Sequence, residues 1–189
     1  MPSALSRQRR LLVSISLLTT FAESMLVPMY AVFTESVGGS ILDAGIAFAC
    51  FSMATGIFVS LVGTRSYFQH HVKTFLVLGF FVSASCDISY IFVQNRWQLF
   101  GAQVLAGLAT GLIEPAWDSL FTDAIENSSA RHWSIWSGGT HLVAGVAALL
   151  GGVIVAYFSF KVLFVSMGLI DMFAAFLAVR EKPAKASLA

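Results

Sequence analysis

The chain has 189 residues, of which 57% are hydrophobic and only 11% are charged, and its formal net charge is +1. Soluble domains carry about 25% charged residues, so this composition excludes an ordinary water-soluble domain and indicates that lipid is the solvent. The small net charge also excludes a basic surface for nucleic acid, and no nucleic-acid-binding motif occurs in the sequence.

Six apolar segments follow one another along the chain, each close to the roughly 20 residues that cross a bilayer as a helix. Short stretches rich in turn-forming and charged residues separate them. The sequence therefore predicts an all-α integral membrane protein, with a single six-helix transmembrane domain over residues 1–189. The predicted helices cover residues 11–33, 41–62, 74–94, 97–122, 133–158 and 160–179.

The first segment has a second interpretation, because the basic run RQRR followed by LLVSISLLTTFA is similar to a secretory signal peptide. However, the apolar run continues through MLVPMYAVF after a single acidic residue, Glu23. This continuation makes the segment long enough to span a bilayer. We therefore expect it to remain in the protein as the first transmembrane helix.

The basic residues are distributed unevenly between the two ends of the predicted bundle. If the N-terminus is cytoplasmic, nine of the eleven Lys and Arg residues lie inside and only Arg96 and Lys161 lie outside. The positive-inside rule then predicts that both termini are cytoplasmic, and we expect the plasma (inner) membrane as the location. The nine inside residues are Arg7, Arg9, Arg10, Arg65, Lys73, Arg131, Arg180, Lys182 and Lys185.

Ionisable side chains occur inside the apolar segments, where a charged group costs on the order of 3 kcal/mol. Glu23 lies at the centre of the first segment, and Glu114 and Asp118 lie one turn apart on one face of the fourth. No Lys or Arg lies deep within a segment, so these carboxyl groups must be protonated, hydrogen-bonded or paired with a bound cation. Asp171 in the sixth segment is a further intramembrane carboxyl group. The residues predicted to line a path for substrate or protons are Glu23, Asp87, Glu114, Asp118 and His141.

Proline and glycine occur where they would shape the same helices. Pro28 and Pro115 each lie within five residues of an acidic side chain, and a proline inside a helix frees a carbonyl group and bends the axis. Glycines let helices approach closely and slide, although static packing explains each of them equally well. The predicted hinge and packing residues are Pro28, Pro115, Gly107, Gly111, Gly151 and Gly152.

No complete catalytic or metal-binding motif occurs, so we expect no catalytic residue, metal or other cofactor. Ser137 and His141 suggest an intramembrane hydrolase, but no nucleophile elbow or orienting acid accompanies them. Trp117, Trp133 and Trp136 flank the turn between the fourth and fifth segments, and we interpret them as anchors at the membrane interface. The sequence therefore favours a protein that is not an enzyme.

The stretch LFGAQVLAGLATGLIEPAWDSLFTDAIENSSAR, residues 99–131, resembles the fourth helix and following loop of a major facilitator superfamily transporter. The matching features are the glycine-rich helix, Pro115, the aspartate near the helix end and Arg131. The paired glycines of AALLGGVIVAYFSFKVLF extend the similarity to one six-helix half of such a transporter, over residues 11–180. Three features differ: the loop GTRSYFQHHVK lacks an aspartate–arginine element, Gln103 stands where many proton-coupled members have arginine, and Ala147-Ala148 replaces the Gly-Pro of drug antiporters.

The resemblance implies transport of a small solute and a second six-helix half beside this one, with protons or another cation as the candidate coupling ions. The second half is expected to be another copy of the chain, with a separately encoded half or the rest of a longer chain as alternatives. A neutral or cationic solute is favoured, because no deep Lys or Arg is available to hold an anion. The alternative function is a non-transporting assembly or regulatory subunit with the same fold.

Overall fold

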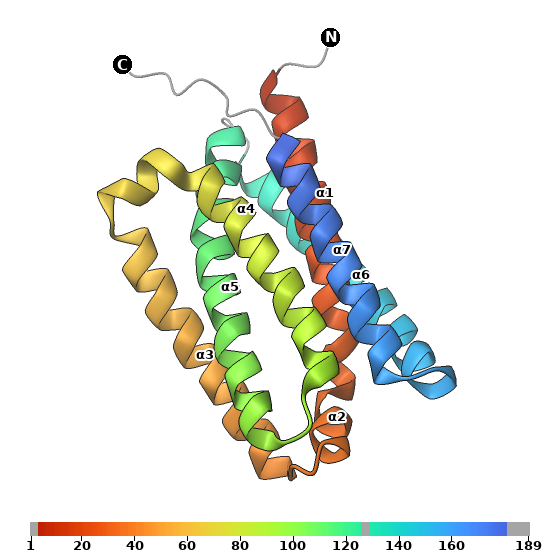
Figure 1. The fold of residues 1–189 in the computed structure, drawn as a ribbon. Coiled ribbons are helices and arrows are strands. Elements are labelled where there is room, and N and C mark those ends of the chain that lie inside the picture. The colour runs from red at the N-terminus through yellow and green to blue at the C-terminus, as the bar shows by residue number, and fades with distance from the viewer. Residues whose placement is uncertain (1–3, 126–128, 181–189) are drawn as a thin grey trace.

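The computed structural model describes residues 4–125 and 129–180 of the chain (Figure 1). The described residues form helices joined by short turns and contain no β-strand, and six helical stretches are long and apolar enough to cross a membrane. This confirms the predicted all-α membrane fold. The helices are α1 (Ala4–Leu26), η1 (Val27–Met29), α2 (Tyr30–Ser36), α3 (Ile41–Gly63), α4 (Ser66–Ser89), η2 (Tyr90–Phe92), α5 (Arg96–Ala124), α6 (Ser129–Tyr157) and α7 (Phe160–Arg180).

Several helices begin earlier than the apolar runs predict. α1 begins at Ala4 rather than at residue 11, and α6 begins at Ser129 rather than at residue 133. α4 begins at Ser66 rather than at residue 74, with a non-helical backbone at His71 (φ −128°, ψ 22°). The additional turns are rich in polar and charged residues, so hydropathy marks where the apolar run starts while helical hydrogen bonding continues beyond it.

The first transmembrane stretch is interrupted at Pro28, which lies in the 3₁₀ segment η1 between α1 and α2. Proline has no N–H to donate and its ring crowds the preceding turn, so the α-helical hydrogen-bond pattern changes there. In contrast, α5 continues as one helix through Pro115.

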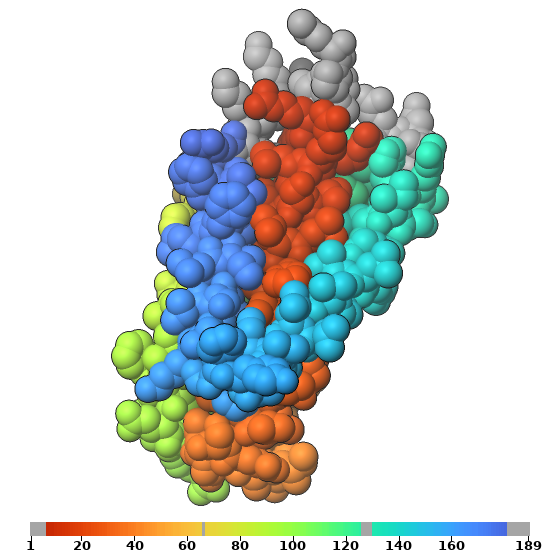
Figure 2. All heavy atoms as spheres, turned by 90° about the vertical axis from the view of Figure 1, so that its right-hand side faces the viewer, coloured from red at the N-terminus to blue at the C-terminus, as the bar shows by residue number. Residues whose placement is uncertain are grey.

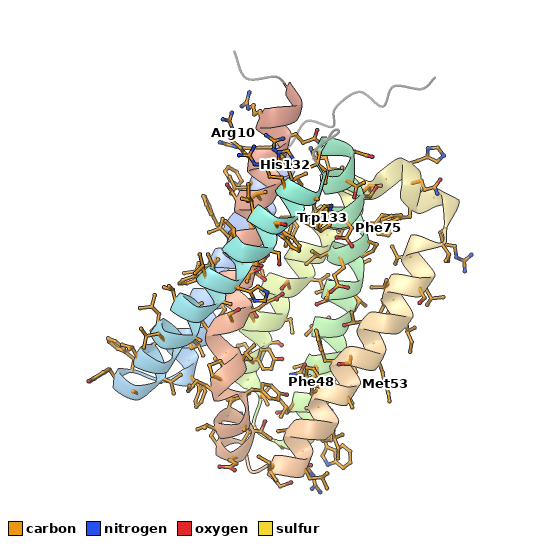
Figure 3. The ribbon with its side chains drawn as sticks, turned by 180° about the vertical axis from the view of Figure 1, so that it is seen from behind. Arg10, Phe48, Met53, Phe75, His132 and Trp133 are labelled. Carbon is orange, nitrogen blue, oxygen red and sulfur yellow. The ribbon has the colours of Figure 1, made fainter. Side chains whose placement is uncertain are left out.

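The helices form an open arc in which α3 packs on α5, α5 on α4, α4 on α7, α7 on α1 and α1 on α6. α3 and α6 are the two ends of this arc, and Figure 3 shows them on opposite sides when the bundle is seen from behind. Only 11% of the most apolar part of α3 and of α6 is buried, against 44% for α4 and α7. At one end of the bundle η1 contacts α6 and α2 contacts α3, and along the rest of the face between α3 and α6 no described helix is packed across the bundle.

Close contact between α3 and α5 depends on two glycines of α5. A methyl group placed on Gly107 would lie 2.6 Å from the carbonyl oxygen of Phe51 and 2.7 Å from Cβ of Ala54. A methyl group on Gly111 would overlap Cβ of Phe58. The two helices can approach this closely only because both positions lack a side chain.

The glycine pair of α6 behaves differently at its two positions. Gly151 lies directly against the backbone of Met25 on α1, where a methyl group would overlap the carbonyl oxygen. At Gly152 a methyl group would make only an ordinary contact, 3.7 Å from Cε of Met29. Gly151 is therefore the residue of this pair that allows α6 to approach α1.

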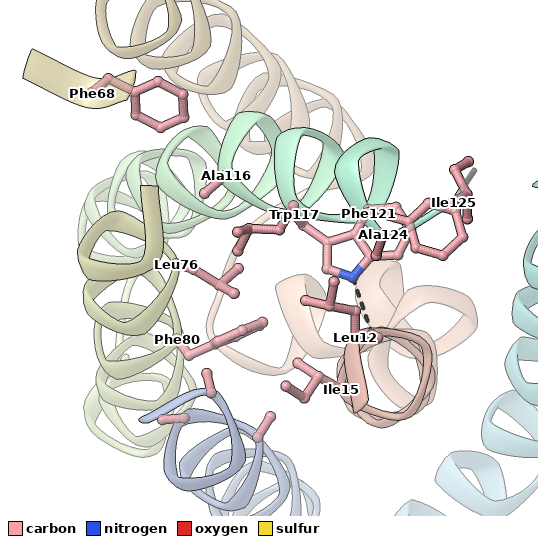
Figure 4. Packing of buried hydrophobic residues seen from close by; sticks show 14 residues of the cluster. Leu12, Ile15, Phe68, Leu76, Phe80, Ala116, Trp117, Phe121, Ala124 and Ile125 are labelled. Carbon is pink, nitrogen blue, oxygen red and sulfur yellow. Dashed lines mark hydrogen bonds between the residues drawn. The ribbon is translucent and has the colours of Figure 1, made fainter. Parts of the chain in front are cut away.

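Trp117 is a core residue, and its interpretation as an interfacial anchor is wrong. Its side chain is 5% exposed, and its Nε1 donates a hydrogen bond of 3.1 Å to the carbonyl oxygen of Leu12 (Figure 4). Its ring stacks on Phe121 and Trp136, with centroid distances of 4.5 and 4.6 Å. These contacts join α1, α5 and α6 at the end of the bundle where α1 begins.

The start of α1 and the end of α7 lie at the same end of the bundle (Figure 1). Of the basic residues predicted to be cytoplasmic, Lys182 and Lys185 lie outside the described residues. Which side of the membrane this end faces stays a prediction from the charges.

Candidate functional site: a carboxylate-lined cavity

A cavity of about 410 Å³ lies between α1, α3, α4, α5 and α7. Glu23 of α1 and Asp87 of α4 line it, and Glu23 lies near the middle of its transmembrane stretch, Arg7–Ser36. No described Lys or Arg lines the cavity. It is therefore an acidic site within the membrane-spanning part of the bundle, with Glu23 near the middle of its span.

The Glu23 side chain is exposed in the isolated chain because it faces this open cavity. It forms no hydrogen bond or ion pair with the residues that the structure describes. Its carboxyl group lies within electrostatic range of Asp171 and Glu114. The carboxyl group of Glu23 can therefore bind a proton or a solute without breaking a contact with the described residues.

Asp171 of α7 lies behind the cavity wall and is 1% exposed. Its Oδ2 accepts a hydrogen bond from Oγ of Ser83, whereas its buried Oδ1 has no partner among the described residues. Ser83 and Asp87 are one turn apart on α4, and both line the cavity. Ser83 thus connects the buried carboxyl group of Asp171 to the cavity.

Glu23, Asp87 and Asp171 lie within electrostatic range of one another, although the described residues contain no cluster suited to a metal ion. A buried carboxylate without a cation is costly, so such a group favours a proton or a positively charged partner. Chemically, the arrangement can hold protons or bind a cationic or hydrogen-bond-donating solute.

Aromatic side chains form much of the remaining cavity wall. Tyr90 is held in place by stacking on Phe164 at 5.1 Å and by an edge contact with Phe33 at 5.9 Å. The buried hydroxyl oxygen of Tyr30 makes no well-aligned hydrogen bond with the described residues, and the side chains of Gln103 and Thr34 lie near it. The aromatic residues that line the cavity are Tyr30, Phe48, Phe51 and Tyr90.

The structure brings together only part of the predicted path. Glu23 and Asp87 share the cavity, whereas Glu114, Asp118 and His141 are exposed and do not line it. Glu114 and Asp118 do lie within electrostatic range of each other, as their spacing predicts. Their participation in a path stays a prediction.

The sequence analysis did not identify the remaining polar residues of the cavity wall, among them Ser83, Gln103 and Thr110. Ser83 could have been recognised from its one-turn spacing to Asp87 on the same helix. Gln103 lines the cavity from α5, at the position where the resemblance places an arginine in proton-coupled members. The side chain that replaces that arginine therefore faces the candidate site.

Six membrane-length helices with carboxyl groups around a central cavity define a polytopic integral membrane protein. The family model of the Major Facilitator Superfamily matches residues 12–189, and the chain belongs to this family.

Two relatives show similarity over most of this chain. The chain is 22% identical over 166 residues to the uncharacterized MFS-type transporter MJ1560 of Methanocaldococcus jannaschii, which covers 85% of this chain and 43% of that protein. It is 24% identical over 148 residues to the uncharacterized MFS-type transporter YitZ of Bacillus subtilis, which covers 76% of this chain and 88% of that protein. The match thus spans less than half of the archaeal relative and most of the bacterial one.

Proposed function

We propose that this protein forms one six-helix half of a secondary transporter for a small neutral or cationic solute. The observation that carries the proposal is the central cavity lined by Glu23 and Asp87, without a described Lys or Arg. Secondary transporters place substrate sites near the bilayer midplane, at the interface between their repeats. Both relatives are named as MFS-type transporters, which supports the same general activity.

The chemistry of the cavity favours a solute with a positive charge or hydrogen-bond donors. Glu23 and Asp87 provide acceptor oxygens, and Tyr30 and Tyr90 provide aromatic faces that attract an ammonium group. An anionic solute would meet like charge without an arginine or lysine clamp. Protons and the solute would compete for the same carboxyl groups, which is a physical basis for coupling transport to a proton or cation gradient.

We infer that a second six-helix unit covers the face between α3 and α6. This face leaves Glu23 uncovered, and α3 exposes large apolar side chains there and around it, including Phe48 at 64%, Met53 at 69% and Ile57 at 57%. A carboxyl group turned toward lipid is costly, whereas a second unit would enclose it in a shared path.

The simplest second unit is another copy of this chain in the same orientation, forming a homodimer in the plasma (inner) membrane with its termini in the cytoplasm. A separately encoded half, or the rest of a longer chain, could occupy the same face.

The test is transport by the purified protein in proteoliposomes, with and without an imposed pH gradient. Radiolabelled organic amines, amino acids, sugars and inorganic phosphate would be supplied separately. We expect uptake of a cationic or neutral compound, and no uptake of phosphate. Uptake of phosphate alone would contradict the proposed solute class. Absence of uptake for every compound, with correctly folded protein, would favour the non-transporting assembly or regulatory subunit.

A further inference from the structure

A second cleft, of about 560 Å³, lies between α1 and α6 at the end of the bundle where α1 begins. Arg9 and Arg10 line it from α1, and Arg131 and His132 line it from the first turns of α6. Figure 3 shows Arg10 and His132 close together at this end. The cleft, which we call the arginine cleft, shares no lining residue with the carboxylate-lined cavity.

The positive charge in the arginine cleft is not compensated by the described residues. Arg9, Arg10 and Arg131 form no ion pair with any of them, and no described acidic side chain lines the cleft. Guanidinium groups present paired N–H donors whose geometry matches two oxygens of a phosphate or carboxylate. Three of them in one cleft therefore form a site for an oxyanion.

The walls of the arginine cleft are held together by side-chain contacts. Nε1 of Trp136, which lines the cleft, donates a hydrogen bond of 2.9 Å to Oγ of Ser16 on α1. Trp133, one turn before Trp136, makes an edge contact of 5.0 Å with Phe121 of α5. These contacts fix α6 against α1 and α5, so the arginines converge on a preformed cleft.

The position of the arginine cleft favours a phospholipid over a soluble molecule as the source of such an oxyanion. The apolar run of the first segment begins at Leu11, directly after Arg10, so the guanidinium groups lie at the depth of lipid headgroups. Figure 2 shows α1 uncovered between α6 and α7, on the outer surface of the bundle. This surface is open to lipid.

An apolar strip leads from the arginine cleft along α6. Ile135 lines the cleft and is 62% exposed, and Leu142, Val146 and Leu149 are 76%, 55% and 70% exposed. Their spacing places all four on one side of the helix. A phosphate group in the cleft would therefore have its acyl chains alongside a continuous apolar surface.

We propose that the arginine cleft binds the phosphodiester headgroup of an anionic phospholipid, whose acyl chains lie along the apolar strip of α6. The three guanidinium groups hold the phosphate oxygens, and the lipid bridges α1 and α6. This site does not depend on the proposed transport function.

The proposal is tested with purified, delipidated protein in detergent, titrated separately with phosphatidylglycerol, phosphatidylcholine and inorganic phosphate. Binding is followed by retention of lipid in native mass spectra and by the change in tryptophan fluorescence. The variant is R9Q/R10Q/R131Q, and the matched control R7Q/R65Q/R180Q removes the same charge from the same end outside the cleft. We expect phosphatidylglycerol to bind more tightly than phosphatidylcholine, with at least a roughly tenfold loss in the cleft variant and little change in the control.

Three results would overturn the proposal. Equal losses in the cleft variant and the control would show that general surface charge attracts the lipid. Displacement of phosphatidylglycerol by low concentrations of inorganic phosphate would assign the cleft to a soluble anion. Equal binding of both lipids would exclude a preference for a headgroup with net negative charge. If the triple variant does not fold, R131Q and R7Q are compared in the same way, and an equal affinity for phosphatidylglycerol would also overturn the proposal.

Discussion

Ser83 on α4 donates a hydrogen bond to the Oδ2 oxygen of Asp171 on α7, deep in the membrane-spanning part of the bundle. Asp171 is 1% exposed, so its carboxyl group cannot exchange this donor for water of the bulk phase. The bond joins two helices and also places Asp171 next to the cavity that Ser83 and Asp87 line. One hydroxyl group therefore links the packing of the bundle to its candidate site.

We predict that Ser83→Ala destabilises the folded protein, because it leaves a buried carboxyl oxygen without its donor. Loss of such a partner typically costs about 1–3 kcal/mol. The matched control is Ser85→Ala on the same helix, whose exposed hydroxyl bonds only to the carbonyl oxygen of Phe81. Thermal unfolding in detergent should show a lower midpoint for Ser83→Ala and little change for Ser85→Ala. Equal midpoints for the two variants would contradict this role of Ser83.

We predict that Gly107→Ala separates α3 from α5. The added methyl group would lie 2.6 Å from the carbonyl oxygen of Phe51, and overpacking of this kind costs about 1–3 kcal/mol. Gly101→Ala on the same helix is the control, because a methyl group there meets nothing within 4 Å. Gly107→Ala should lower the thermal midpoint, and Gly101→Ala should leave it unchanged or raise it. An unchanged thermal midpoint for Gly107→Ala would contradict this prediction and would mean that α3 can move away from α5 without loss of stability.

The transmembrane stretches could be predicted because an apolar run long enough to cross lipid is a local property of the sequence. The glycines of α5 could be predicted for the same reason, since a GxxxG spacing places Gly107 and Gly111 on one face. The pairing of Ser83 with Asp171 could not, because it depends on how α4 and α7 are rotated and crossed. The prediction for Trp117 was wrong for the same reason. Its position near a helix end indicates the membrane interface, but its ring points inward and its Nε1 donates a hydrogen bond to Leu12 of α1.

The residues of the candidate site also differ in how far the sequence predicts them. The central position of Glu23 follows from counting residues, and the structure places its side chain in the cavity. Glu114 has an equally unusual position in an apolar run, yet it does not line that cavity. Hydropathy identifies a polar residue within a span, but it does not say which side of the helix faces the neighbouring helices.

The predicted topology can be checked by cysteine labelling of intact cells with a membrane-impermeant reagent, in a background lacking Cys50 and Cys86. Single cysteines at Glu35 and Gln94 should react from outside, because these exposed positions lie at the end of the bundle opposite the start of α1. A cysteine at Gln69, which is exposed between α3 and the main part of α4, should react only after permeabilisation. Labelling of a cysteine at Gln69 from outside would contradict the predicted topology and indicate that the protein has the opposite orientation in the membrane.

We predict that the functional unit contains two six-helix units. The native mass of the protein in lipid nanodiscs should correspond to two copies of the 20.4 kDa chain. A second copy is expected because the face between α3 and α6 would otherwise expose Glu23 and large apolar side chains of α3. A strictly monomeric protein that still transports would refute the homodimer. A monomer that transports only beside another protein would indicate a separately encoded half.

The last prediction concerns Glu23 as the principal polar group of the transport path. Glu23→Gln keeps the shape of the side chain and removes its charge, so it should abolish transport of a cation or transport coupled to protons. Pro28 interrupts the helix shortly after Glu23, so the backbone there can change shape when the two halves move. Glu35→Gln is the control, because Glu35 is an exposed residue near the end of α2 and does not line the cavity.

A purely structural role for Glu23 makes a different prediction. If Glu23 served only to tie α1 to a neighbour, glutamine would largely replace it and transport would continue at the wild-type rate over the whole pH range. Because Glu23 forms no hydrogen bond with the described residues, we expect Glu23→Gln to lose transport without a lower thermal midpoint. If Asp171 acts mainly in packing, Asp171→Asn should lower the thermal midpoint and retain transport, because the substitution changes the buried contact with Ser83. Wild-type transport by Glu23→Gln at every pH would move the assignment to Asp87, the other carboxyl group in the cavity wall, or to Glu114 on α5.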